Sequence, residues 1–77
     1  MEIKEFIENF ANQFDDTDVS VFSAETRFRE LDEWSSLLAL SVLAMVDEED
    51  DVQLKADQMR KANTVQELFD IVKSLKD

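Results

Sequence analysis

The sequence predicts a small all-α protein, an up-and-down bundle of three main helices and one short helix with a long first loop. Three observations favour this fold class. The chain of 77 residues contains no glycine and no proline, which removes the commonest devices of tight strand turns. Apolar residues recur at helical spacing near both ends. The hydrophobic content of 44% is too high for a disordered acidic tail, and the length suits one domain, residues 1–77.

The first helix is predicted near the N-terminus, and a long loop follows it. Asp15, Asp16 and Asp18 are poor interior helix residues, so the helix is expected to end there. Residues 15–35 follow no sustained period, but we expect an ordered loop with Val21, Phe22, Phe28 and Leu31 on the core. The apolar stripe of the helix consists of Ile3, Phe6, Ile7, Phe10, Ala11 and Phe14.

The second helix is expected to begin at Ser35 or Ser36, where a serine can cap the free N–H groups. From Leu37 to Val46 the only polar residue is Ser41, so this helix is apolar nearly all round. A bundle of this size can hardly bury every side of one helix. Part of its surface is therefore expected to serve a ligand or a partner.

A short helix and a final helix complete the bundle. Residues 56–62 have room for one or two helical turns, with Met59 facing inward. The last helix opens with a capping box formed by Thr64 and Glu67. Its apolar stripe consists of Val65, Leu68, Phe69, Val72 and Leu75.

Composition excludes several function classes. Without cysteine or histidine the chain has no disulfides, no thiolate–imidazole zinc site and no histidine-based catalysis. A net charge of −11 repels nucleic acid and anionic membranes and favours partners with basic faces. Leu37–Val46 is too short to span a membrane, and Met1–Phe14 mixes charged with apolar residues, unlike a signal peptide. We expect a monomer in the cytoplasm, without stable membrane insertion.

Charge is unevenly placed along the chain. Leu31–Leu54 contains no lysine or arginine. The acidic residues there do not match a calcium loop, which needs alternating ligands and a glycine at its turn. On this pattern alone, a solvated charge run beside a core helix explains the segment as well as a functional site does. Its acidic residues are Asp32, Glu33, Asp47, Glu48, Glu49, Asp50 and Asp51.

The segment Leu31–Val52 resembles the phosphopantetheine attachment region of acyl carrier proteins. That family shows an Asp-Ser-Leu triplet, then an apolar helix that ends in an acidic run. Ser36-Leu37 stands in the Ser-Leu place, and Asp47-Glu48-Glu49 follows eleven residues after the serine, at the family's spacing. Thr26-x-Phe28 and Thr64-Val65-Gln66 resemble the flanking elements, so the similarity covers nearly the whole chain.

The sequence also departs from the family pattern. Ser35 stands where the family usually has aspartate, and Leu38 and Ser41 replace residues that are often acidic. Asp50 takes a place usually held by phenylalanine or tyrosine, so we expect Asp50 to be solvent-exposed. These departures favour a divergent, discrete carrier for a dedicated pathway.

The resemblance implies that Ser36 carries a covalent 4'-phosphopantetheine arm, moved from coenzyme A by a phosphopantetheinyl transferase. Ser35 suits the N-cap better, and only Ser36 leaves the acidic run in register. The protein would not be an enzyme. It would hold an acyl group as a thioester and present it to acyl-transferring and acyl-modifying enzymes with basic docking faces. Their docking surface is expected to comprise Glu33, Leu37, Met45, Asp47 and Glu48.

Two alternatives remain open. One is an unmodified acidic helical module that binds a basic protein through the same face. The other is an aminoacyl or peptidyl carrier, although those are often less acidic. Trp34, two residues before Ser36, is interpreted as an aromatic anchor that holds the long loop against the bundle.

Overall fold

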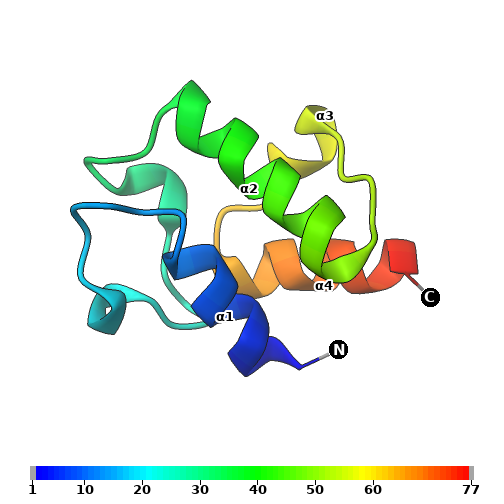
Figure 1. The fold of residues 1–77 in the computed structure, drawn as a ribbon, viewed down its shortest axis with the longest axis horizontal. Helices are drawn as coiled ribbons and strands as arrows, with labels where there is room; N and C mark the ends of the chain where they lie inside the picture. Colours follow the sequence, from blue (N-terminus) through cyan, green and yellow to red (C-terminus); the bar gives the residue numbers. More distant parts are fainter. Residues whose placement is uncertain (1, 77) are drawn as a thin grey trace.

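Four α-helices form the described part of the chain, residues 2–76, in a computed structural model (Figure 1). They are α1 (Ile3–Ala11), α2 (Ser36–Asp50), α3 (Ala56–Met59) and α4 (Val65–Lys76). Two single 3₁₀ turns, Val19–Val21 and Phe28–Glu30, interrupt the long first loop, and no strand occurs in residues 2–76. The predicted small, all-helical fold is confirmed at this level.

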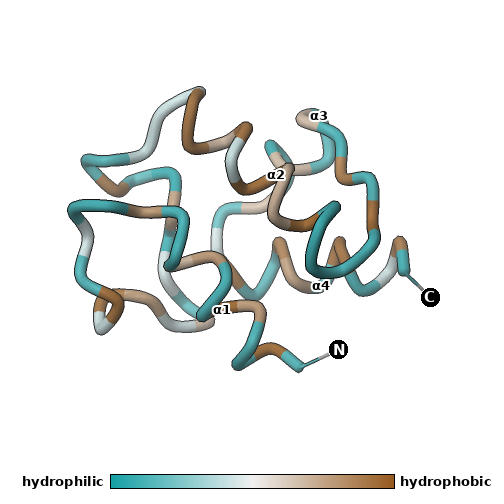
Figure 2. Tube along the Cα trace, viewed as in Figure 1, coloured by the Kyte–Doolittle hydropathy of each residue, from teal (hydrophilic) through white to brown (hydrophobic). Residues whose placement is uncertain are grey.

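The helices enclose one hydrophobic core. In Figure 1, α1 and α4 lie at the bottom of the view and α2 crosses above them, and α1 contacts both α2 and α4. The Cα radius of gyration is 11.1 Å. Figure 2 shows apolar residues at helical intervals along these helices and a hydrophilic end on α2. All six phenylalanines are buried: Phe6, Phe10, Phe14, Phe22, Phe28 and Phe69.

Helix α1 is shorter than expected, because it ends at Ala11 and not near Phe14. The chain continues for another turn, in which the Phe14 N–H donates to the Ala11 carbonyl at 3.0 Å. This turn keeps the Phe14 ring buried, 5.5 Å from the Phe10 ring centroid. The apolar stripe is therefore realised by a helix followed by a turn.

Aromatic packing orders the long loop. The centroid of Phe22 lies 4.8 Å from that of Phe14, and the centroid of Phe28 lies 5.3 Å from that of Phe10. Trp34 packs edge-to-face on Phe28 at 5.0 Å, as its predicted anchoring role requires. Val21 is 47% exposed, so the prediction that it faces the core is wrong. The larger phenylalanine rings occupy the core beneath the loop.

Hydrogen bonds join the same loop to the start of α4. The Val65 N–H donates to the Thr26 carbonyl at 3.1 Å, and the Gln66 N–H donates to the Ala24 carbonyl at 2.9 Å. The predicted capping box is present: the Thr64 N–H donates to Glu67 Oε1 at 3.0 Å, and the Glu67 N–H donates to Thr64 Oγ1 at 3.2 Å. The free N–H groups of α4 are thus satisfied by the loop and by the cap.

The remaining elements follow the predicted pattern with small differences. Helix α3 has a single turn, ends at Met59, and buries that side chain as expected. Leu75 lies outside the core, although the rest of its predicted stripe on α4 is buried. Among the described helices, none combines the length and apolar character that a membrane crossing requires.

Helix α2 ends without a glycine. Its C-cap residue, Asp51, adopts the left-handed conformation at φ 56° and ψ 41°. Aspartate visits this region more readily than most residues, because its short polar side chain can bond locally. This residue turns the chain away from α2 toward α3.

Candidate functional site

Two adjacent serines open α2. Ser35 is the N-cap: its backbone is extended, and its Oγ accepts a hydrogen bond from the Leu38 N–H at 3.2 Å. Ser36 is the first helical residue and is exposed to solvent. The structure thus gives the two serines different positions, as the sequence predicted. The hydroxyl of Ser36 lies where an enzyme can reach it, at the partly positive end of a helix of 15 residues.

One side of α2 is turned to solvent along the whole helix. Leu37 is 75% exposed and Leu40 is 64% exposed, and their spacing of three residues places them side by side on the helix surface. At 100° per residue, the members of this side fall within an arc of about 120°. We call it the exposed α2 face; it consists of Ser36, Leu37, Leu40, Ala44, Asp47 and Glu48.

Met45 does not belong to this face. Its side chain is only 4% exposed and packs in the core together with Val42 and Val46. The expectation that Met45 contributes to a docking surface is therefore wrong. Leu40 and Ala44 take its place, because they lie on the same side of the helix as Leu37 and Asp47.

Glu33 has a structural role that the sequence did not reveal. Its carboxylate accepts hydrogen bonds from the Asp15 N–H at 2.8 Å, the Asp16 N–H at 3.1 Å and Thr17 Oγ1 at 2.7 Å. The bond from Thr17, supported by those backbone bonds, holds the pKa of Glu33 below its usual value. The carboxylate predicted to meet a partner thus ties the two ends of the long loop together.

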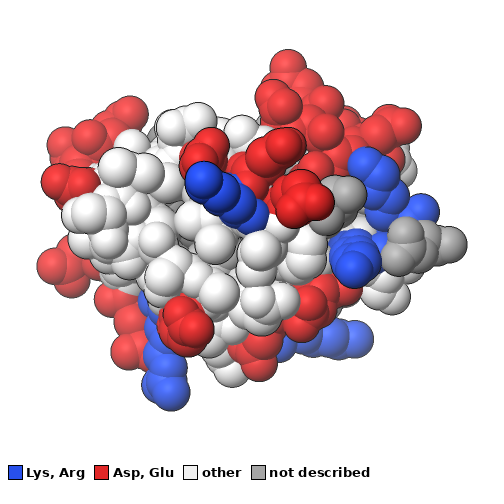
Figure 3. Space-filling view, turned by 90° about the horizontal axis from the view of Figure 1, so that it is seen from below, with Lys and Arg blue, Asp and Glu red and all other residues white. Residues whose placement is uncertain are grey.

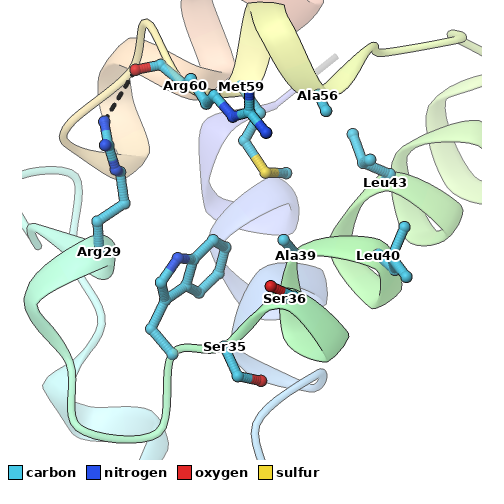
Figure 4. Close-up of a pocket in the computed structure, with 10 residues that line it drawn as sticks. Arg29, Ser35, Ser36, Ala39, Leu40, Leu43, Ala56, Met59 and Arg60 are labelled. Carbon is cyan, nitrogen blue, oxygen red and sulfur yellow. Dashed lines mark hydrogen bonds between the residues drawn. The ribbon is translucent and has the colours of Figure 1, made fainter.

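A groove lies beside Ser36, between the N-terminal half of α2 and α3 (Figure 4). Its volume is about 480 Å³. In Figure 4, Leu40 and Leu43 project from α2, while Met59 and Arg60 stand across from them. The lining residues are Arg29, Trp34, Ser35, Ser36, Ala39, Leu40, Leu43, Ala56, Met59 and Arg60. The groove is therefore mostly apolar, with polar groups at its ends.

The two arginines of the groove are held differently. Arg29 Nη1 donates to the Arg60 carbonyl oxygen at 2.8 Å, the bond drawn as a dashed line in Figure 4. It also approaches Asn63 Oδ1 at 3.4 Å. Arg60 Nη1 lies 3.8 Å from the Asp57 carboxylate, and both side chains are mostly exposed. Such an exposed pair contributes little, so the Arg60 guanidinium can turn to another anion.

The acidic end of α2 divides into exposed and buried residues. Asp47, Glu48 and Glu49 are exposed. Asp50 is 9% exposed, so the expectation that it faces solvent is wrong. Its Oδ2 atom is buried and accepts no hydrogen bond from residues 2–76. Burial raises the pKa of the Asp50 carboxyl, and the positive charge of Lys76 partly opposes that rise.

Acidic side chains are more prominent than basic ones on the face of the molecule seen in Figure 3. Figure 3 shows the molecule from below, with many acidic side chains and fewer basic ones among uncharged areas. Within residues 2–76 the carboxylates do not gather into a cluster that could hold a metal ion. The net charge of −11 favours long-range attraction of basic partners.

Comparisons with models of protein families, with curated proteins and with solved structures found no match to this chain. The resemblance to acyl carrier proteins therefore stays a prediction that depends on the residue pattern.

The burial of Asp50 and the exposed α2 face are both predictable from helical spacing in the sequence. Asp50 follows Val46 and Val42 at intervals of four residues, the spacing of one helix side, and both valines are buried. The same spacing predicts the exposed α2 face, because its residues lie on the side of the helix opposite to these valines. The groove and the Glu33 contacts had no such signal, because both join residues far apart in the chain.

Proposed function

We propose that this chain is an acyl carrier protein in which Ser36 carries a 4'-phosphopantetheine arm. The observation that carries the proposal is the position of Ser36: an exposed hydroxyl on the first turn of α2, beside an apolar groove. The residues present fit such a group. The hydroxyl is accessible, the groove is open at its side, and the adjacent Ser35 already satisfies the cap.

The chemistry asks little of the carrier itself. In arm transfer, Ser36 Oγ would attack the phosphorus that bears the pantetheine arm in coenzyme A, forming a phosphodiester as the pyrophosphate bond breaks. Adenosine 3',5'-bisphosphate would leave, and the hydroxyl proton would pass to the transferase or to water. The first turn of α2 favours the resulting negative charge, because its unpaired N–H groups and the helix dipole stabilise anions. The arm supplies the thiol that this cysteine-free chain lacks, which allows a thioester to form.

The exposed α2 face would serve as the docking surface for partner enzymes. Its leucines offer apolar contact near Ser36, and Asp47 and Glu48 offer negative charge at the far end. Asp47 lies about 17 Å along the helix axis from Ser36 and is rotated from it by only about 20°. A basic partner that binds this acidic end would therefore have its active-site entrance near the arm. An acyl chain can shelter in the apolar groove between visits to such enzymes.

The test is arm transfer followed by intact-mass measurement. Incubation with coenzyme A and a broad-specificity phosphopantetheinyl transferase should add one arm to the wild type and none to Ser36→Ala. Ser35→Asp is the matched control, because aspartate is an equally good N-cap and removes the neighbouring hydroxyl. This variant should still accept one arm. No addition to the wild type with several transferases, or an arm mapped to Ser35, would refute the assignment.

A second candidate is an unmodified acidic module that binds a basic protein. The exposure of Leu37 and Leu40 favours it, since apolar residues on a helix face mark protein contacts whether or not an arm is present. The same mass measurement separates the two functions. An unmodified chain that still binds its partner through Leu37 and Leu40 would support this candidate.

A further inference from the structure

The groove beside Ser36 differs in charge from the rest of the molecule. The chain has 19 acidic and 8 basic residues, including three arginines. Two of these arginines, Arg29 and Arg60, line the groove, and no acidic residue is among the described residues that line it. In a protein of net charge −11, this is a local site where an anion meets cationic side chains and no lining carboxylate.

The arginines also retain donors for a ligand. The guanidinium group has five N–H donors in a planar fork, and the contacts of Arg29 to the Arg60 carbonyl and to Asn63 involve only one of its nitrogens. Among the described residues, the Arg60 side chain makes only the long, exposed contact with Asp57. Guanidinium groups with free donors bind carboxylates in a bidentate manner.

The walls between these charges are apolar. Leu40 and Leu43 come from α2, Met59 comes from α3, and Trp34 also lines the groove. From Ser36 to Leu43 the groove follows α2 for about 10 Å, the length of an extended chain of roughly eight carbons. A ligand that fits both properties has an alkyl body and one anionic end.

We infer that this groove binds a medium-chain carboxylate without a covalent link, with the alkyl chain against Leu40, Leu43 and Met59 and the carboxylate at Arg60 and Arg29. The inference goes beyond the proposed function, because it requires no arm and no modification of Ser36. It predicts that the unmodified chain recognises a free medium-chain fatty acid and binds neutral chains of equal length more weakly. In a chain that carries the arm, the same groove should recognise a tethered acyl group with a terminal carboxylate.

Trp34 provides the readout. It is the single tryptophan, the chain has no tyrosine, and its ring lines the groove. Titrating the full unmodified chain with octanoate should give a saturable change in tryptophan fluorescence. Octanol, which has the same chain length without the charge, should bind several-fold more weakly. A second comparison tests whether the groove also binds an acyl group on the arm. It uses one chain loaded at Ser36 with a dicarboxylic half-thioester and another loaded with an octanoyl thioester.

Arg60→Gln and Lys61→Gln form a matched pair. Both remove one positive charge from neighbouring, exposed side chains, but only Arg60 lines the groove. Arg60→Gln should weaken octanoate binding about fivefold, equivalent to about 1 kcal/mol, and leave octanol binding unchanged. Lys61→Gln should leave both unchanged. Circular dichroism should show the same helix content in all three proteins.

Three results would overturn the inference: no saturable change with octanoate, equal affinities for octanoate and octanol, or equal effects of the two substitutions. None of these depends on arm transfer. Failure of the proposed function would appear in the mass of the transferase product, and failure of this inference in the fluorescence titration. The two outcomes can therefore be told apart.

Discussion

Asp50 offers a direct test of the bundle's energetics, because its carboxylate is buried at the end of α2 and its Oδ2 atom has no hydrogen-bond partner among residues 2–76. Asp50→Asn keeps the size of the side chain and removes its charge. A buried polar atom left without a partner costs about 1–3 kcal/mol, and a charged one costs more than a neutral one. The amide retains part of this cost, and the variant loses the attraction of Lys76, so we expect a gain near the lower limit.

A gain of about 1 kcal/mol corresponds to a rise in melting temperature of about 4–8 °C for a domain of this size. Thermal melts followed by circular dichroism at pH 7 measure it. Glu49→Gln is the matched control: it removes the same charge from the next residue, which is exposed. Its smaller effect reports the general relief of charge repulsion, and the difference between the two variants reports burial.

The gain should also depend on pH with a defined sign. Burial raises the pKa of Asp50 in the folded state, so ionisation of this group destabilises the fold above that pKa. As the pH falls below the unfolded pKa, Asp50 is protonated in both states and the penalty disappears. The advantage of Asp50→Asn should therefore be full at pH 7 and absent near pH 3. An advantage no larger than that of Glu49→Gln at pH 7, or one that persists near pH 3, would refute the reasoning.

Two further perturbations test the docking surface and the loop. Asp47→Lys with Glu48→Lys should slow arm transfer several-fold at low salt without loss of helix content, and the difference from wild type should shrink as salt screens exposed charges; equal low-salt rates would remove these residues from the docking model. Glu33→Gln should speed amide exchange at Asp15 and Asp16, because one oxygen replaces the two that now accept bonds. Since the pKa of Glu33 is lowered in the fold, the slower amide exchange of the wild type should be present above the unfolded pKa and should vanish as acid protonates the carboxylate. A ratio of variant to wild-type exchange rates that does not change with pH would contradict this.

The periodic parts of the sequence predicted their structure well. Helices α1 and α4 each have one apolar side, so spacing identified both the helix and the buried residues. Helix α2 is apolar on nearly every side, and spacing therefore could not decide which side faces the core. The resemblance predicts Met45 on the docking surface, and the apolar pattern of α2 contains nothing that would correct this, although Met45 is buried.

The candidate site was predictable only in its local parts. The N-cap position of Ser35 and the first-turn position of Ser36 follow from their order at a helix start, which the sequence contains directly. The groove depends on how α3 packs against α2. The hydrogen bonds to Glu33 join residues that are 16–18 positions apart in the chain. Such contacts form only when the whole chain packs, so a local pattern of residues cannot predict them.

The left-handed turn at Asp51 bears on why this chain manages without glycine. Every residue of an unfolded glycine-free chain carries a Cβ atom, which restricts its backbone and lowers the conformational entropy lost on folding. The absence of glycine causes backbone strain in the folded state at Asp51, the single position among residues 2–76 with a positive φ angle. Glycine there would relieve a native-state strain of about 1 kcal/mol. It would also raise the conformational entropy of the unfolded chain, which stabilises the unfolded state by a similar free energy. The two effects nearly cancel, so aspartate at this turn keeps the denatured chain stiff at almost no net loss of stability.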